Sequence, residues 1–273
     1  MRTLLLIFLT FALVPLQPVG GQDFHGDRGT PPPPLHLKVL MIGNSYTSQT
    51  NDMFQQFVRS DPNASMTLSL ATQASWGTAD HYASRHLMVY DGQTRSLIDK
   101  LRQEDWDVVI VQEISTLPSE AFLDIPGTRT LLQSGWADLS ALIQAEAPNA
   151  LIRPYQTWPR AWGNSYLQAF FQDDPVQMHL ATMRAYDLLA SAIGGEIIPV
   201  GSAFTWSMVQ APALSLHSGD GAHPSPHRRY LAGATLYAFV FDRSPHQSGY
   251  SAGGDPAAEA WLLQVADQIW QVR

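Results

Sequence analysis

The sequence predicts an α/β protein, a three-layer α/β/α sandwich in which helices cover both faces of a central parallel sheet of five strands. From about residue 36 onward, short apolar runs alternate with longer amphipathic runs. This alternation is typical of parallel strands joined by helices. The chain has 273 residues, 45% of them hydrophobic, which is enough for one sizeable core. The sequence contains no internal repeat and no second hydrophobic unit, so residues 36–273 are expected to form a single domain.

The predicted strands are five short runs dominated by apolar residues, and the predicted helices are six longer runs with helical spacing of apolar positions. The strands are Leu37–Ile42, Met66–Ala71, Val108–Gln112, Ala150–Tyr155 and Glu196–Val200. The helices are Asp52–Arg59, Arg95–Gln103, Thr130–Ala145, Val176–Ala192, Arg228–Phe241 and Pro256–Val272.

Residues 1–21 have the features of a secretion signal. Arg2 provides the positive charge, Leu4–Val14 is a short apolar segment, and small residues follow at the expected cleavage point. Residues 22–35 are mostly polar and include four consecutive prolines at 31–34, which predicts an extended spacer. The protein is therefore expected to be secreted or periplasmic, without stable membrane insertion once the signal is cleaved. An uncleaved anchor is the less favoured alternative, because the apolar segment is short.

Composition limits the partners. The formal net charge is −8, and the few basic residues form no stripe, which argues against nucleic acid as a partner. The sequence has no cysteine, so the fold contains no disulfide, and its stability depends on the core alone. The histidines show no spacing typical of a metal site. We expect no metal and no organic cofactor.

Two segments far apart in the chain carry the residues of a serine nucleophile and its base. Ser45 falls just past the strand predicted at Leu37–Ile42, where its hydroxyl can be exposed. Asp220 and His223 lie three positions apart near the other end of the chain. A serine hydroxyl needs an adjacent imidazole to take its proton, and a carboxylate can hold that imidazole in the right tautomer. Together the three residues predict nucleophilic catalysis.

These segments resemble the SGNH/GDSL hydrolase superfamily, and the resemblance extends from His36 to the C-terminus. Gly43-Asn44-Ser45-Tyr46-Thr47 resembles the first sequence block, with Gly-Asn-Ser in place of the commoner Gly-Asp-Ser, as in an esterase-like branch of the family. Asp220-Gly221-Ala222-His223-Pro224-Ser225 resembles the last block, and it is the more specific of the two. The resemblance implies a flavodoxin-like sandwich.

The resemblance also implies the site residues. Ser45 would be the nucleophile, His223 the base and Asp220 the carboxylate that orients it. The oxyanion formed during acyl transfer would be held by the N–H groups of Ser45 and Gly77 and by a side-chain amide. The family usually has asparagine in the third block, whereas here the strand ends in Gln112, whose amide lies on a stem one methylene longer.

Aromatic residues near the predicted strand ends are candidates for a substrate pocket. Trp76, Tyr155 and Trp158 are the best placed, and such rings stack on sugars as readily as they fill a core. The run from Gly249 to Gly253 also fits the Gly-x-Ser-x-Gly elbow of another hydrolase fold. No histidine follows it, so a glycine-rich loop is expected there.

The predicted function is hydrolysis of carboxylic esters, small-molecule or glycan, through an acyl-enzyme intermediate, with carbohydrate deacetylation as one candidate reaction. Two alternatives use the same residues. The first is a catalytically silent carbohydrate-binding protein on the same fold, and the second is an acyltransferase that passes the acyl group to a sugar hydroxyl.

Overall fold

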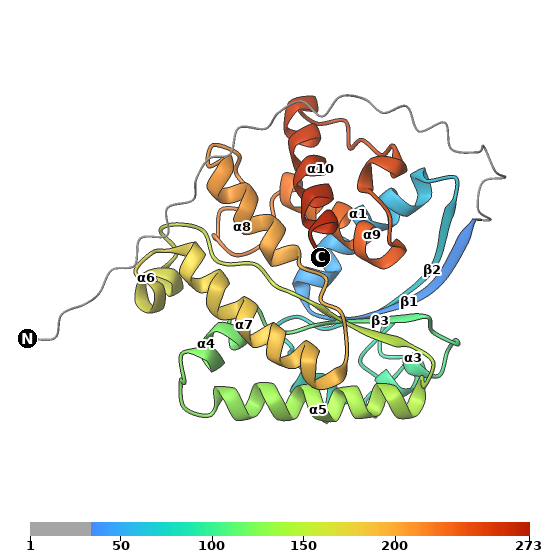
Figure 1. Ribbon diagram of the computed structural model, residues 1–273. Coiled ribbons are helices and arrows are strands. Elements are labelled where there is room, and N and C mark those ends of the chain that lie inside the picture. Colours follow the sequence, from blue (N-terminus) through green and yellow to red (C-terminus); the bar gives the residue numbers. More distant parts are fainter. Residues whose placement is uncertain (1–33) are drawn as a thin grey trace, which may run out of the picture. The chain divides into compact units, whose positions relative to one another are not determined.

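The computed structural model describes residues 34–273, which form an α/β sandwich around a parallel sheet (Figure 1). The sheet has four strands in the order β2-β1-β3-β4, and every pair is parallel. The strands are β1 (Leu35–Gly43), β2 (Ala64–Thr72), β3 (Val108–Gln112) and β4 (Leu151–Tyr155). The predicted signal segment and most of the proline-rich spacer lie outside the described residues.

The pleat of the central strands divides the interior into two cores. In β1, Val39 and Met41 point into one hydrophobic cluster, whereas Leu40 and Ile42 point into another. All four side chains are fully buried. Because alternate residues of a strand face opposite sides, an unbroken apolar run fits a strand that is covered on both faces.

Helices cover each face of the sheet (Figure 1). One face is covered by α1 (Ser45–Ser60), α8 (Val200–Gln210), α9 (Pro226–Phe241) and α10 (Pro256–Gln271). The other is covered by α3 (Leu97–Leu101), α4 (Leu117–Phe122), α5 (Thr128–Glu146) and α7 (Pro175–Ile193). The short elements α2 (Thr78–Ala83), α6 (Ser165–Phe171) and the 3₁₀ helix η1 (Pro245–Ser248) lie in the connections.

The prediction of a fifth strand over Glu196–Val200 is wrong. Only Ile198 pairs with β4, through a single bridge to Tyr155. The Ile198 N–H donates to Pro154 O at 2.8 Å, and the Gln156 N–H donates to Ile198 O at 3.1 Å. The ladder stops there because Pro199 has no N–H to donate and α8 begins at the next residue.

Helix α1 begins at Ser45, seven positions before the start predicted from apolar spacing. Its first turns are polar in sequence but buried, since Thr47 and Thr50 are fully covered. Their hydroxyls both donate hydrogen bonds, that of Thr47 to the Gln112 side chain and that of Thr50 to the Tyr46 carbonyl. Because these buried residues are polar, the spacing of apolar residues did not reveal the first turns of the helix.

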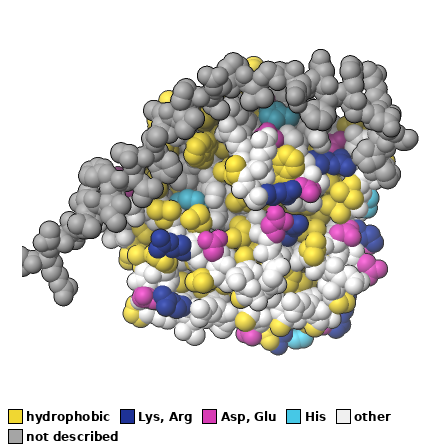
Figure 2. Space-filling view, viewed as in Figure 1, with side chains coloured by type: hydrophobic (Ala, Val, Ile, Leu, Met, Phe, Trp, Pro, Cys, Tyr) yellow, Lys and Arg dark blue, Asp and Glu magenta, His cyan; other side chains and the backbone are white. Residues whose placement is uncertain are grey.

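Charged side chains of both signs are interspersed over the face shown in Figure 2, with no large area of one sign. Among the described residues, no helix is both long and apolar enough to cross a membrane.

Helices α1 and α9 pack closely at Gly233, which gives a test of the fold. A Cβ added there would lie 2.7 Å from Met53 Cβ and 2.8 Å from the Met53 carbonyl carbon. We predict that Gly233→Ala lowers the free energy of unfolding by about 1–3 kcal/mol, although alanine is the better helix former by about 1 kcal/mol. Urea unfolding measures the change. Gly219→Ala, where no atom lies near the added Cβ, is the control, and a stabilised Gly233→Ala variant would contradict the close packing.

Candidate active site

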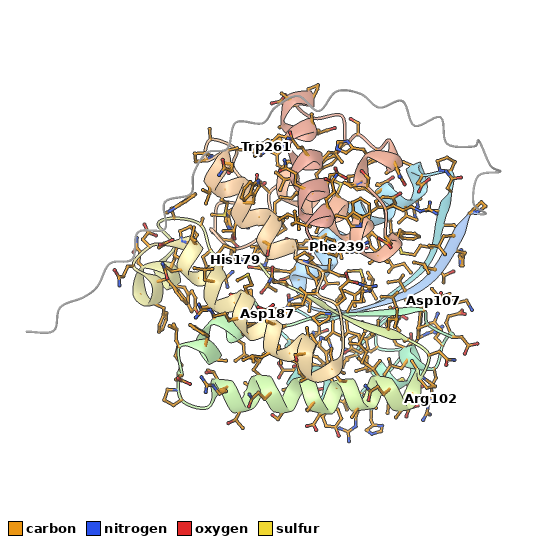
Figure 3. The ribbon with its side chains drawn as sticks, viewed as in Figure 1. Arg102, Asp107, His179, Asp187, Phe239 and Trp261 are labelled. Atoms are coloured by element: carbon orange, nitrogen blue, oxygen red, sulfur yellow. The ribbon has the colours of Figure 1, made fainter. Side chains whose placement is uncertain are left out.

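The candidate site lies where the strands end. Asp107, the residue before β3, lies at the edge where the strands begin, on the right of Figure 3, whereas His179 of α7 lies toward the opposite edge. Ser45 lies two residues after the end of β1, and the segment after β3 reaches the same edge. Ligands of open parallel sheets bind outside the carboxyl ends of the strands.

The structure brings the three residues of the predicted triad together. Ser45 Oγ lies 3.0 Å from His223 Nε2, and His223 Nδ1 lies 2.5 Å from Asp220 Oδ2. With Nδ1–H donating to the carboxylate, Nε2 is left as the acceptor for the serine hydroxyl. Ser45 and His223 are both partly exposed, so a substrate can reach them.

Asp220 is fixed by its own turn. Its Oδ1 accepts from the N–H groups of Ala222 and His223, each at 2.9 Å, and from the Ser218 hydroxyl at 2.8 Å. Burial alone would raise the pKa of Asp220, but the hydrogen bonds from His223 and Ala222 outweigh it and hold the pKa well below its usual range. The carboxylate therefore remains ionised and keeps its orientation toward the imidazole.

Asn44 shapes the turn that presents the nucleophile. It is the N-cap of α1, and its Oδ1 accepts from the Tyr46 N–H at 3.1 Å. Its Nδ2 donates to Trp76 O at 3.0 Å, which ties the turn to the loop after β2. The Ser45 N–H has no acceptor among residues 34–273, so it is free to donate to an oxyanion.

The amide of Gln112, predicted to donate to the oxyanion, is hydrogen-bonded to other groups of the protein. Its side chain is fully buried, and its Nε2 donates to the Glu113 carbonyl. Its Oε1 accepts from the Asn44 N–H at 3.0 Å and from the Thr47 hydroxyl at 2.9 Å. An acceptor is required beside that N–H, so the oxygen of the amide faces the nucleophile turn. Through these bonds, the Gln112 side chain holds the turn that presents Ser45.

Gly77 approaches the end of β3 closely. A Cβ at this position would clash with Glu113 Oε1, so any other residue would displace the buried Glu113 carboxylate. The buried Glu113 carboxylate accepts from the Thr78 hydroxyl at 2.6 Å and from the Ile114 N–H at 2.8 Å. The Gly77 N–H, predicted to hold the oxyanion, donates instead to Asp80 Oδ2 at 2.9 Å.

Two of the three predicted pocket residues do not line a pocket. Tyr155 and Trp158 are both fully buried. Tyr155 contacts Thr50 through its hydroxyl, and Trp158 stacks against Tyr46 with centroids 4.1 Å apart. Their position after β4 is as expected, but their side chains turn into the core that covers one face of the sheet. Trp76 is partly exposed, and its carbonyl accepts a hydrogen bond from Asn44, the residue before Ser45.

The carbonyl of Ala222 anchors the loop that carries His223, which sequence patterns did not reveal. It accepts from the Tyr46 hydroxyl at 2.9 Å and from Trp158 Nε1 at 3.0 Å. A third donor, Arg228 Nη1, lies at 3.5 Å. The Tyr46 ring also lies edge-on to the imidazole, with centroids 5.6 Å apart. These donors come from α1, the β4–α6 loop and α9, so the loop is held from three sides.

Outside the triad, the buried His81 and His179 and the partly exposed His217 are held neutral by lowered pKa values. Burial lowers the pKa of His81 and of His179 to about 4 each. Burial and then the Arg228 charge lower the pKa of His217 to about 3. His81 bridges Tyr90 and the Gly43 carbonyl directly before the nucleophile turn, at 2.5 and 3.0 Å. It therefore acts as a structural support of that turn.

The competing serine motif lies elsewhere. Ser251 donates to Glu259 Oε2 at 2.7 Å, in the glycine-containing loop before α10. The expectation of a loop there is confirmed, and among the described residues no histidine contacts this serine.

Comparison with known proteins identifies the fold. No family model matches the sequence, and no curated protein matches it. A DUF4886 family protein from Bacteroides uniformis ATCC 8492 is similar in structure, with TM-score 0.73 and 19% identity over 85% of this chain and 94% of that one. A protein assigned as an SGNH hydrolase from Slackia heliotrinireducens has TM-score 0.54 and 25% identity over 76% of this chain and all of its own. An acetyl xylan esterase also has TM-score 0.54, with 15% identity over 75% of this chain and all of its own.

The support from Gln112 can be tested by replacement with methionine, which keeps the size and removes the amide. The buried Asn44 N–H then loses its acceptor, so Gln112→Met is expected to lower the free energy of unfolding by about 1–3 kcal/mol. Chemical denaturation measures the change. Gln168→Met, on the exposed part of α6, is the control. An unchanged free energy of unfolding in Gln112→Met would contradict this supporting role.

The neutral state of buried His81 predicts a pH dependence of stability. Because its folded pKa is about 4 and an unfolded imidazole titrates near about 6.5, the unfolded chain binds more protons between these values. Its contribution to stability is complete above about pH 6.5 and is lost on acidification, by at most about 1.4 kcal/mol per pH unit.

The His81→Gln variant should show a shallower fall in unfolding free energy between pH 6.5 and 4.5 than the unchanged protein. The exposed His246→Gln variant should keep the full slope. Equal slopes for all three proteins would mean that His81 is protonated in the folded state.

Proposed function

We propose that this chain, which has the fold of the SGNH/GDSL hydrolase superfamily, is a serine esterase that cleaves carboxylic esters. The observation that carries the proposal is the continuous hydrogen-bond chain from Ser45 through His223 to Asp220. It places a nucleophile, a base and an orienting carboxylate in the order that acyl transfer requires. Esterases and lipases among the structural neighbours support the same reaction class.

The reaction proceeds in two steps. Ser45 Oγ attacks the ester carbonyl while His223 Nε2 takes its proton, and the imidazolium, stabilised by Asp220, then protonates the departing alkoxide. In the second step, His223 takes a proton from water as the water oxygen attacks the acyl-enzyme. The imidazolium then returns the proton to Ser45 Oγ as the carboxylic acid is released.

The oxyanion of each tetrahedral intermediate would be held first by the Ser45 N–H. This group lies at the N-terminus of α1, where the helix dipole also favours negative charge. The Gly77 N–H would be a second donor only after the Asp80 carboxylate releases it. Such preorganised donors are each worth about 10²–10³ in turnover.

For the substrate, we propose short-chain carboxylic esters, with acetylated carbohydrate as the first natural class to test. Export is proposed from residues 1–21, which precede the described part of the chain. A catalytically silent carbohydrate-binding protein is the second candidate, because Gln112 and the Gly77 N–H are both engaged away from Ser45. Covalent labelling of Ser45 by a fluorophosphonate distinguishes the two. Product analysis with and without a sugar acceptor distinguishes an acyltransferase from a hydrolase.

The nucleophile is tested by Ser45→Ala, measured on 4-nitrophenyl acetate. Activity is expected to fall by at least about 10³-fold, because the covalent route is lost. The unfolding transition should shift little, since the lost hydroxyl is partly exposed. Ser48→Ala, one turn along α1 and exposed, is the matched control and should keep full activity. Turnover retained by Ser45→Ala would refute the assignment.

A further inference from the structure

Arg160 lies beside the candidate site on the loop that follows β4. Its Nη1 donates to the Tyr46 hydroxyl, and its Nη2 donates to Ser115 Oγ at 2.9 Å. Tyr46 is the residue after the nucleophile, and its ring lies edge-on to the His223 imidazole. The Arg160 side chain therefore reaches the site from β4, between the ends of β1 and β3.

No carboxylate neutralises this cation. Within residues 34–273, no Asp or Glu oxygen lies within 4.0 Å of the Arg160 guanidinium. Both of its acceptors are neutral hydroxyls, and they use two of its five N–H donors. The residue is also partly exposed, so the remaining donors can meet a ligand.

A second cation increases the positive charge behind Arg160. Arg228 is fully buried against the faces of Phe204 and Trp158, at 4.5 and 5.2 Å from the ring centroids. No salt bridge joins Arg228 to a carboxylate among the described residues. Burial lowers the pKa of Arg228 and the Arg160 charge lowers it further, whereas the Asp220 carboxylate acts in the opposite direction. The Asp220 carboxylate is hydrogen-bonded to His223 and forms no salt bridge with either arginine.

We propose that Arg160 is a specificity-determining residue that binds a carboxylate group carried by the ester substrate. The proposal rests on the esterase function above. The planar guanidinium matches a carboxylate with two parallel hydrogen bonds. Ser115 adds a hydroxyl beside it, and its proton has no acceptor among residues 34–273. The substrate is thus an acidic ester, with the carboxylate on either the acyl part or the alcohol part.

The test compares pairs of esters that differ only in this charge. For the alcohol part, the pair is 3-acetoxybenzoate and its methyl ester. For the acyl part, the pair is 4-nitrophenyl hydrogen adipate and methyl 4-nitrophenyl adipate. In one pair, kcat/KM of the acidic ester is expected to exceed that of the neutral one by about ten- to hundredfold, the range for charge-assisted hydrogen bonds. The pair that shows the preference identifies the side of the ester.

Variants assign the preference to Arg160. Arg160→Met should abolish it while the neutral ester is still hydrolysed, and Arg160→Lys should keep part of it. Arg59→Met, at the exposed end of α1, should leave it unchanged. Equal rates for acidic and neutral esters in the unchanged protein, or a preference that survives in Arg160→Met, would overturn the proposal. Hydrolysis of the neutral esters would leave the esterase function intact in either case.

Binding provides a readout that does not need turnover. Calorimetric titration with 3-hydroxybenzoate and adipate, the acidic products, should show binding that Arg160→Met loses and Arg59→Met retains. Binding that is independent of Arg160 would refute the carboxylate site. Failure of Ser45-dependent hydrolysis with intact Arg160-dependent binding would refute the esterase function alone.

Discussion

The Ala222 carbonyl oxygen is the point on which the arrangement of the site depends. His223 must meet a serine 178 positions earlier in the chain, and no local structure can bring them together. Hydrogen bonds from Tyr46 and Trp158 to this one oxygen attach the histidine loop to α1 and to the segment after β4. Tyr46 is the residue after Ser45, and its hydroxyl binds the carbonyl of the residue before His223. One side chain therefore positions the nucleophile relative to the base. Loss of this anchor would separate Ser45 from His223 even with all three triad residues unchanged.

The predictable parts of the molecule are those that follow from local pattern. Fully buried runs such as Val108–Gln112 have few alternatives to a central strand, and the triad residues carry chemistry that their spacing reveals. The direction of a side chain after a strand end is different, because it depends on which helix packs there. Tyr155 and Trp158 were correctly placed along the chain, yet their rings turn into the core. The Glu196–Val200 strand failed because Pro199 ends its pairing.

Gln112 ends β3 at the position where the resemblance predicted the third block. Its side-chain oxygen accepts hydrogen bonds from the Asn44 N–H and the Thr47 hydroxyl, so the amide supports the nucleophile turn. The Asn44 N–H, which faces this amide, belongs to the residue that replaces the commoner aspartate. Both departures therefore meet in one hydrogen bond.

The near-absence of a fifth strand leaves β4 almost at the border of the sheet. Exposed borders can recruit the strand of another molecule, since their N–H and C=O groups are unpaired. Here Pro154 presents no N–H, the one bridge at Ile198 covers the carbonyl beside it, and an Arg153–Glu196 ion pair adds charge. The border at β4 is thus poorly suited to templating, so strand addition to this side of the sheet is disfavoured.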